Sequence, residues 1–340
     1  MLMNNSNKIA VIGAGSWGTA LAGVLAGKGL ETALWGYNPE HVAALDRERE
    51  NKKYLPGYHF PPSLLPTVDL AAAVRGCTTV CMVVPSHGFR LVFEAVVPFL
   101  EQGCRIVSAV KGIENNSLMT MTQVMAEVLG SRLQEKGISL AVLSGPSFAK
   151  EVTLGMPTAV TIGCHNIETA KELQSIFGTE RFRVYASSDV IGLEISAALK
   201  NIVAIAAGIS DGLGYGLNSR AALITRGLAE IKRLGVKMNA DPLTFFGLSG
   251  LGDLVLTCTG DLSRNRTVGL KLGQGKKIAV ILEEMEMVAE GVKTTLSVYD
   301  LARRLQVDMP ILEQVYQILY NDKDCSSAVL DLLTREMKIE

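Results

Sequence analysis

Near its N-terminus the sequence reads Lys8-Ile9-Ala10-Val11-Ile12-Gly13-Ala14-Gly15-Ser16-Trp17-Gly18. The apolar residues 8–12 are typical of a buried strand, and residues 19–26 continue with a helical pattern. Between them Gly13 allows a tight turn, Gly15 lets a pyrophosphate approach the backbone, and Gly18 lets the helix pack close to the strand. A second apolar run at 32–36, about 20 residues on, completes the start of a βαβ unit. This stretch therefore predicts a dinucleotide site.

Length and charge set the frame for the rest of the chain. Its 340 residues, of which 48% are hydrophobic, exceed the usual size of one domain and predict two. The 33 basic and 34 acidic residues give a formal net charge of -1. Because so balanced a charge creates no global field, nucleic acid and anionic membrane surfaces are not expected as partners.

The cysteines and the termini indicate a cytoplasmic protein. Six cysteines occur without a CxxC pair or the spacing of metal ligands, so we expect reduced, buried thiols and no metal site. The polar residues 1–7 lack the pattern of a signal peptide. No apolar run in the sequence is expected to reach the length of a membrane span.

Two apolar runs, at 79–84 and 105–110, are expected to form buried parallel strands. His87 follows the first and Lys111 follows the second. Since ligands bind beyond the carboxyl ends of such strands, both residues are candidates for the site. His87 fits a loop histidine bonded to backbone as well as a functional one, whereas the glycine beside Lys111 favours a ligand contact over a plain surface lysine.

Further β-like runs at 139–143, 158–163 and 182–185 predict a sheet of seven or eight strands. Beyond residue 187 the pattern becomes helical. Helices are expected at 189–209, 219–234, 241–246, 263–272, 278–284, 294–305, 310–320 and 326–333. The chain is therefore predicted to join an α/β domain with a doubly wound sheet, residues 1–188, to an all-α domain, residues 189–340.

Lys200 is the most informative residue of the second half. It is the only charged residue between Glu194 and Asp211. Burial without a partner would be costly and would lower the pKa of its amine toward a value useful for proton transfer. A lysine that extends to solvent from a core helix explains the same pattern.

Two polar stretches follow Lys200. Residues 247–254 are expected to form a glycine-rich loop that carries one carboxylate, Asp253. Ser263 is expected to cap the next helix, and Arg264 and Asn265 occupy its first turn. A basic residue there reverses the usual preference for acids. The free amides, the guanidinium and the side-chain amide predict a phosphate site, and a solvated basic helix start is the alternative.

Tyr37 leaves the choice of cofactor open. It follows the second predicted strand, where NAD sites often carry an acid for the ribose 2′-hydroxyl. The missing acid permits a 2′-phosphate, but no arginine at this position favours NADP.

These motifs, in this order, resemble those of bacterial NAD(P)-dependent glycerol-3-phosphate dehydrogenases over essentially the whole chain. The resemblance rests on residues 13–20, 84–87, 111–112, 144–149, 200–201, 250–254 and 263–266. It implies a Rossmann-type domain followed by an all-α domain, and reduction of dihydroxyacetone phosphate to sn-glycerol 3-phosphate with NADH or NADPH. It further implies a cytoplasmic homodimer that serves phospholipid synthesis.

The resemblance also assigns residues. Cofactor contacts are expected from Gly13, Gly15, Ser16, Trp17, Gly18, Tyr37, Lys111, Ala149, Arg264, Val288 and Glu290. Substrate contacts are expected from Lys111, Gly145, Ser147, Lys200, Asp253, Ser263, Arg264 and Asn265. Lys200 would act as general acid, Lys111 would polarise the carbonyl, and Asp253 would orient Lys200 or a substrate hydroxyl.

Two other functions fit parts of the pattern. A related two-domain dehydrogenase could act on a β-hydroxyacid or a sugar acid, and a sensor could bind a dinucleotide without turnover. The roles of His87 and Arg226 stay unassigned, although the spacing of Arg226 and Glu230 is that of an ordinary ion pair on a helix.

Overall fold

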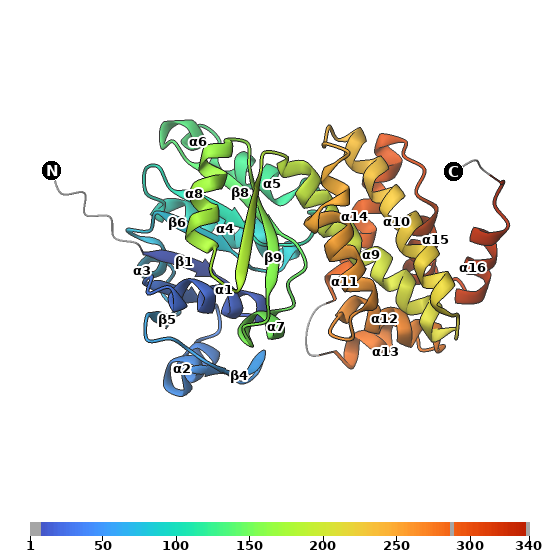
Figure 1. Cartoon of the computed structure of the whole chain (residues 1–340), viewed down its shortest axis with the longest axis horizontal. Helices are drawn as coiled ribbons and strands as arrows, with labels where there is room; N and C mark the ends of the chain where they lie inside the picture. Colours follow the sequence, from blue (N-terminus) through green and yellow to red (C-terminus); the bar gives the residue numbers. More distant parts are fainter. Residues whose placement is uncertain (1–7, 286–288, 338–340) are drawn as a thin grey trace. The chain divides into compact units, whose positions relative to one another are not determined.

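The computed structural model describes residues 8–285 and 289–337, which divide into two compact units. The first unit comprises Met1–Val110 and Met121–Val190, and the second comprises Lys111–Thr120 and Ile191–Glu340. Figure 1 follows the chain through both. The division falls two residues from the predicted boundary. It also assigns the short segment Lys111–Thr120 to the helical unit, which the sequence pattern did not indicate.

The first unit is a doubly wound α/β domain. Its strands are β1 (Ile9–Ile12), β2 (Thr32–Trp35), β5 (Leu64–Thr67), β6 (Thr79–Met82), β7 (Arg105–Ser108), β8 (Ser139–Ser144), β9 (Thr158–Cys164) and β10 (Phe182–Ser187). They form one eight-stranded sheet in the order β10-β9-β8-β7-β6-β1-β2-β5. Every neighbouring pair is parallel except β8 and β9. The expected strand number and the parallel pairing of β6 and β7 are confirmed.

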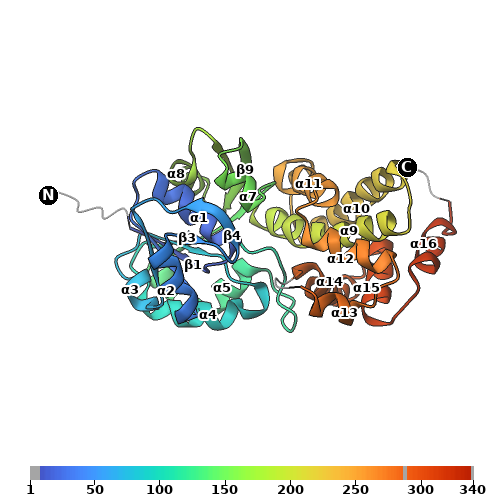
Figure 2. The ribbon, with the colours of Figure 1, turned by 90° about the horizontal axis from the view of Figure 1, so that it is seen from below.

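Helices cover both faces of this sheet. They are α1 (Ser16–Gly27), α2 (Pro39–Glu48), α3 (Leu70–Val74), α4 (Phe89–Val96), α5 (Met121–Leu129), α6 (Arg132–Glu135), α7 (Ala149–Thr153) and α8 (Ile167–Phe177), with the 3-10 turns η1 (Ser86–Gly88) and η2 (Val97–Phe99). Helices α3, α4 and α5 pack in sequence on one face, and α1 packs with α7 and α8 on the other (Figure 2). The strand order reverses between β1 and β6: β2 and β5 lie on one side of β1, and β6 and the later strands lie on the other. Folds of this kind bind ligands at such a point.

Residues 47–67 form three strands that the sequence pattern did not indicate. They contain a small antiparallel pair, β3 (Glu50–Asn51) with β4 (Leu55–His59), and then the edge strand β5 of the main sheet. The prolines of this region concealed β5, because an edge strand needs fewer backbone donors than a central strand and so tolerates proline.

The second unit is helical over the part of Ile191–Glu340 that the structure describes. It consists of α9 (Val190–Gly212), α10 (Leu217–Lys237), α11 (Asp253–Thr259), α12 (Arg264–Gly273), α13 (Ile278–Glu283), α14 (Glu290–Leu305), α15 (Pro310–Tyr320) and α16 (Cys325–Leu333), with the short helical turns η3 (Thr244–Phe246) and η4 (Leu248–Gly252). The predicted glycine-rich loop at 247–254 is wrong, because these residues form the π-helical turn η4 and the start of α11.

Helix α9 is the central core helix of this unit. With 23 residues, it is long and apolar enough to cross a membrane by length and composition, contrary to the sequence-based expectation. The other described helices do not meet that test. Yet 94% of the apolar window of α9 is buried inside the protein, where residues from Ile195 to Ile209 join the hydrophobic core. The length of α9 therefore reflects a core helix.

Glu230 ties α10 to α15. Its buried carboxylate accepts hydrogen bonds from the backbone amides of Ile311 and Leu312, at 2.8 and 3.2 Å, in the first turn of α15. Burial raises the pKa of Glu230 to about 7. The sequence spacing of Arg226 and Glu230 is that of an ordinary helix ion pair, whereas the observed bonds make Glu230 a buried cap of α15.

We expect Glu230→Ala to destabilise the helical unit by about 1–3 kcal/mol, because two buried amides lose their acceptor. The measurement is thermal unfolding at pH 8, where the wild-type carboxyl is ionised, together with hydrogen exchange at the amides of Ile311 and Leu312. Unchanged protection of these two amides would contradict the capping role. Glu230→Gln, which retains one acceptor, should give an intermediate loss.

Candidate functional site

The turn between β1 and α1 has the shape expected of a dinucleotide phosphate site. Gly13 has a φ of +127°, which strongly favours glycine, and a Cβ on Gly18 would overlap the Gly13 carbonyl oxygen. At Gly15 the space around an added Cβ is open. The predicted roles in turn formation and helix packing thus have a steric basis, and the open side of Gly15 leaves room for a phosphate.

Ser16 and Trp17 begin helix α1. Ser16 Oγ donates to the backbone carbonyl of Tyr54 at 2.6 Å, and the Trp17 ring packs near Phe182. Within the described residues the buried Trp17 Nε1 has no hydrogen-bond partner. Because a buried donor without an acceptor is costly, an acceptor on a bound ligand would suit this position. The residues around the turn therefore fit a dinucleotide.

Asn51 supports this turn, and the sequence analysis missed it. Its fully buried amide donates to the Ala14 carbonyl at 3.1 Å and to Thr19 Oγ1 at 2.8 Å. Its Oδ1 accepts from the Tyr54 amide at 3.2 Å. All of the hydrogen-bonding groups of Asn51 thus serve the loop and the glycine turn. In the sequence, Asn51 is distinguished only by its position between charged residues and prolines. That pattern is too weak to predict a role in supporting the glycine turn.

The remaining candidates of the first unit lie at strand ends. Tyr37, just beyond β2, is 82% exposed, and His87 lies in η1 beyond β6. Gly145 follows β8 with a φ of +140°, and Ser147 Oγ donates to its carbonyl at 3.0 Å. Ala149 begins α7. All five are placed as expected from the strand pattern.

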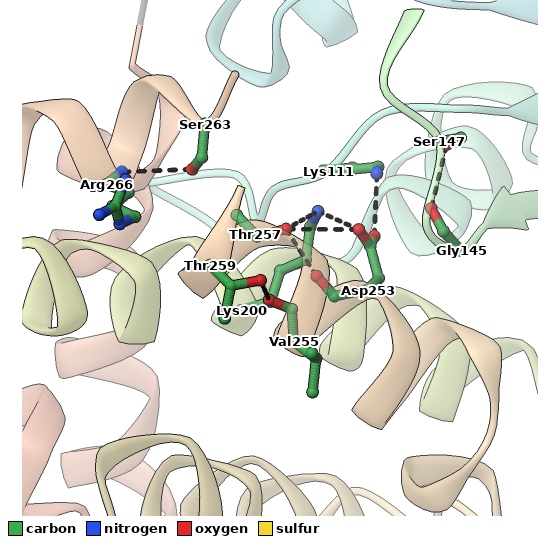
Figure 3. Close-up of polar contacts among 10 residues, drawn as sticks. All are labelled: Lys111, Gly145, Ser147, Lys200, Asp253, Val255, Thr257, Thr259, Ser263 and Arg266. Carbon is green, nitrogen blue, oxygen red and sulfur yellow. Dashed lines mark hydrogen bonds and ion pairs between the residues drawn. The ribbon is translucent and has the colours of Figure 1, made fainter. Parts of the chain in front are cut away.

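The second unit brings Lys111, Lys200 and Asp253 together. Lys200 lies in α9, and Asp253 begins α11. Lys111 begins the segment Lys111–Thr120, which interrupts the first unit in sequence but belongs to the second. Lys200 Nζ lies 2.5 Å from Asp253 Oδ1, and Lys111 Nζ lies 2.9 Å from Asp253 Oδ2 (Figure 3). The Asp253 side chain is 1% exposed, so both ammonium groups share one buried carboxylate.

This environment shifts the pKa values of the cluster. Burial lowers the pKa of Lys200 to about 7; the Asp253 carboxylate opposes that shift, and the Lys111 ammonium adds to it. Burial alone would raise the pKa of Asp253, but the two ammonium groups outweigh it and hold that pKa below its usual value. Lys200 can therefore exchange a proton near neutral pH, while Asp253 stays ionised.

Thr257 completes the cluster and was missed by the sequence analysis. One helical turn after Asp253, its Oγ1 donates to the Asp253 carbonyl at 2.6 Å and accepts from Lys200 Nζ at 2.8 Å. The hydroxyl proton is thereby committed to the backbone, so the oxygen can only accept from Lys200. A helix predicted over residues 253–259 would have placed Thr257 beside Asp253, because the two are four residues apart. The glycines before Asp253 kept the sequence analysis from predicting that helix.

The residues of the predicted phosphate site lie at the start of α12. Ser263 is its N-cap, and Ser263 Oγ accepts from the Arg266 amide at 3.2 Å. The buried Asn265 uses Oδ1 to accept from the Gly291 amide at 2.9 Å, which brings the start of α14, with Glu290, beside the start of α12. Arg264, which lies between Ser263 and Asn265 in sequence, is exposed. Amides at the start of a helix favour an anion as a ligand, and the Arg266 amide is bonded to Ser263 Oγ. Val288, a predicted cofactor contact, lies outside the described residues.

The part of the chain that the structure describes contains no candidate metal site. No group of three or more His, Cys, Asp or Glu side chains there could hold a metal ion. The six cysteines are free thiols: Cys77, Cys81, Cys104, Cys164, Cys258 and Cys325.

Comparisons with known proteins agree across both units. The family model "NAD-dependent glycerol-3-phosphate dehydrogenase N-terminus" matches residues 8–170, and the corresponding C-terminus model matches residues 189–330. A protein named glycerol-3-phosphate dehydrogenase [NAD(P)+] from Desulfotalea psychrophila is 62% identical over 339 residues, 100% of both chains. One of the same name from Citrifermentans bemidjiense is 57% identical over 98% of this chain and 99% of its own.

Solved structures give the same result. The crystal structure of glycerol-3-phosphate dehydrogenase from Coxiella burnetii is 44% identical, with a TM-score of 0.92 over 97% of this chain and 100% of that one. A yeast glycerol-3-phosphate dehydrogenase is 28% identical, with a TM-score of 0.83 over 96% of this chain and 99% of its own. Fold, family models and full-length relatives all agree, and this chain belongs to the family of NAD-dependent glycerol-3-phosphate dehydrogenases.

Proposed function

We propose that this chain reversibly reduces dihydroxyacetone phosphate to sn-glycerol 3-phosphate with NADH or NADPH. The observation that carries the proposal is the pairing of Lys200 and Lys111 on the buried carboxylate of Asp253. Two positive charges on one negative charge leave a net charge of +1. Such a cluster suits a carbonyl oxygen that gains negative charge during the reaction.

Lys200 is the general acid of this reaction. Its ammonium group has three N–H donors, of which Asp253 Oδ1 and Thr257 Oγ1 take two. Its third N–H is directed to the substrate oxygen, and the lowered pKa lets that proton transfer near neutral pH. In the oxidation direction the neutral amine of Lys200 accepts the proton from the substrate hydroxyl.

Lys111 and Asp253 have supporting roles. Lys111 polarises the same carbonyl. Asp253 fixes both amines and keeps their repulsion from separating them. When bound, the reduced nicotinamide supplies the hydride for the carbonyl carbon. The residues of this chain contribute binding, orientation and proton transfer to the reaction.

The substrate phosphate binds at the start of α12. Ser263 Oγ accepts from the Arg266 amide, so its hydroxyl proton serves the phosphate. The Asn265 side chain accepts from Gly291 through its oxygen, which leaves its NH₂ group as a donor. Arg264 supplies the positive charge. Gly145 and Ser147 contact the substrate in this proposal.

The dinucleotide binds at the turn of Gly13, Gly15 and Gly18. Ser16, Trp17, Tyr37, Lys111, Ala149, Arg264, Val288 and Glu290 are its further proposed contacts. With Tyr37 at the end of β2, no carboxylate from this position repels a 2′-phosphate, so we expect both cofactors to be accepted. We also propose residues 1–188 as the cofactor domain and 189–340 as the substrate domain of a cytoplasmic homodimer that supplies phospholipid synthesis.

The central test is oxidation of NADH and of NADPH, measured separately, on addition of dihydroxyacetone phosphate. Wild-type protein should oxidise both, and Lys200→Ala should lower kcat by about 10² to 10⁴ with cofactor binding retained, because it removes the general acid. Turnover of β-hydroxyacids without any response to the phosphorylated triose would contradict the proposal. Cofactor binding without turnover would instead indicate a sensor.

The pH dependence should follow Lys200. Because its pKa is lowered to about 7 and reduction requires the protonated amine, kcat/KM for dihydroxyacetone phosphate should fall as the pH rises through about 7. Oxidation of glycerol 3-phosphate requires the neutral amine and should rise over the same interval. Opposite slopes in the two directions are the expected result, and a common slope would reject proton transfer by Lys200.

Thr257→Val should lower kcat about tenfold, because the loss of one acceptor lets the Lys200 amine leave its productive orientation. The KM for NADH should not change. Thr259→Val is the matched control, since the exposed Thr259 makes the same hydrogen bond to the backbone four residues earlier but has no bond to Lys200 (Figure 3). Equal losses in both variants would assign the effect to helix α11 as a whole.

A further inference from the structure

Two ionised side chains of the helical unit lie at helix ends that disfavour them. Asp211 is in the last turn of α9 and Arg266 is in the first turn of α12. A helix C-terminus repels an acid and a helix N-terminus repels a base. Both side chains are also largely buried, with exposures of 7% and 15%. Neither position helps its own helix, so the reason for these residues must lie in their interaction with each other.

That interaction is a fork on one carboxylate. Arg266 donates to Asp211 Oδ2 from Nε at 2.9 Å, and its Nη2 lies 2.8 Å from the same oxygen in an ion pair. Arg220, from α10, donates to Asp211 Oδ1 from Nε at 3.0 Å and from Nη2 at 2.6 Å. Asp211 thus joins α9 to both neighbouring helices, while the third contact of Arg266 goes to the exposed Asp261.

The backbones of α9 and α12 are also in direct contact. A Cβ on Gly208 would overlap the Arg266 carbonyl oxygen, and a Cβ on Gly269 would overlap the Ile205 carbonyl oxygen. One turn further along, Gly212 and Gly273 lie against each other in the same way. Because no side chain separates the two helices, their contact leaves little room for movement. The contacts of Arg266 with Asp211 therefore fix α12 against α9.

This fixed end carries the phosphate site. The Arg266 amide donates to Ser263 Oγ (Figure 3), and residues two apart on a helix point to nearly opposite sides. The Arg266 side chain therefore holds one side of the first turn against α9, and Arg264 belongs to the other side. Helix α9 also carries Lys200.

We propose that Arg266, held by Asp211, is a positioning residue that sets the place of the phosphate site relative to Lys200. The inference rests on the proposed function of this site. Arg266 touches neither the phosphate nor the reacting atoms. It fixes the separation between the anion-binding turn and the proton donor, and thereby selects substrates whose phosphate and carbonyl match that separation.

The test is Arg266→Lys, which retains the charge but loses the planar fork. We expect the KM for dihydroxyacetone phosphate to rise about tenfold, because a small misplacement of a binding group costs that much or more. The kcat and the KM for NADH should stay within about twofold to threefold. With dihydroxyacetone, which lacks the phosphate, kcat/KM should not change. Arg264→Ala provides the reference for loss of a direct phosphate ligand.

Arg220→Lys is the matched control. It breaks the same kind of fork on the same carboxylate, but its helix α10 carries no part of the phosphate site. Its thermal stability should fall as much as that of Arg266→Lys, with the KM for dihydroxyacetone phosphate unchanged. An equal rise in KM for both variants, or a parallel loss with dihydroxyacetone, would overturn the inference in favour of a general structural role.

If Arg266→Lys does not fold, Asp211→Asn is the second variant that tests the positioning role. Positioning predicts a higher KM for the phosphorylated substrate, whereas a purely electrostatic effect of the two unbalanced arginines predicts a lower KM that salt abolishes. The second result would also overturn the inference. Wild-type protein without any turnover of dihydroxyacetone phosphate would refute the proposed function itself, so the two failures are distinguishable.

Discussion

The carboxylate of Asp253 is the group on which the proposed site depends. An ammonium on a long, apolar core helix would be expelled or neutralised by burial alone, and a second ammonium beside it would add electrostatic repulsion. One carboxylate with 1% exposure compensates both. Lys200 can therefore belong to the hydrophobic core of the helical unit and still carry a proton. Its low pKa and its fixed position arise from the same burial.

Helix α11 shows how the sequence provides this compensation. Asp253 and Thr257 are one turn apart, so both face Lys200. Gly250, just before them, lies so close to the carbonyl of Phe245 that a Cβ would overlap it. A residue with a side chain would move the start of α11. Gly250 is thus a requirement of close packing, and the acid is placed by backbone contact as much as by its own ion pairs.

Local patterns predicted most of the architecture but little of the long-range pairing. Strands such as β6 and the turn at Gly13 follow from apolar runs and glycine spacing, which act over a few residues. Helix α11 escaped prediction because tertiary packing overrides the poor helix propensity of glycine. Lys111 and Asp253 are 142 residues apart in sequence, and nothing in either segment specifies the other. Their proximity is a property of the folded unit alone.

The segment Lys111–Thr120 has a consequence for how the two units can be separated. It leaves the first unit after β7, packs with the helical unit and returns to begin α5. The chain therefore crosses between units three times, and no single cut yields both. A fragment beginning at residue 191 would contain Asp253 and Lys200 without Lys111. A single recombination crossover between relatives anywhere from residue 111 to residue 253 would likewise join a lysine and a carboxylate of different ancestry.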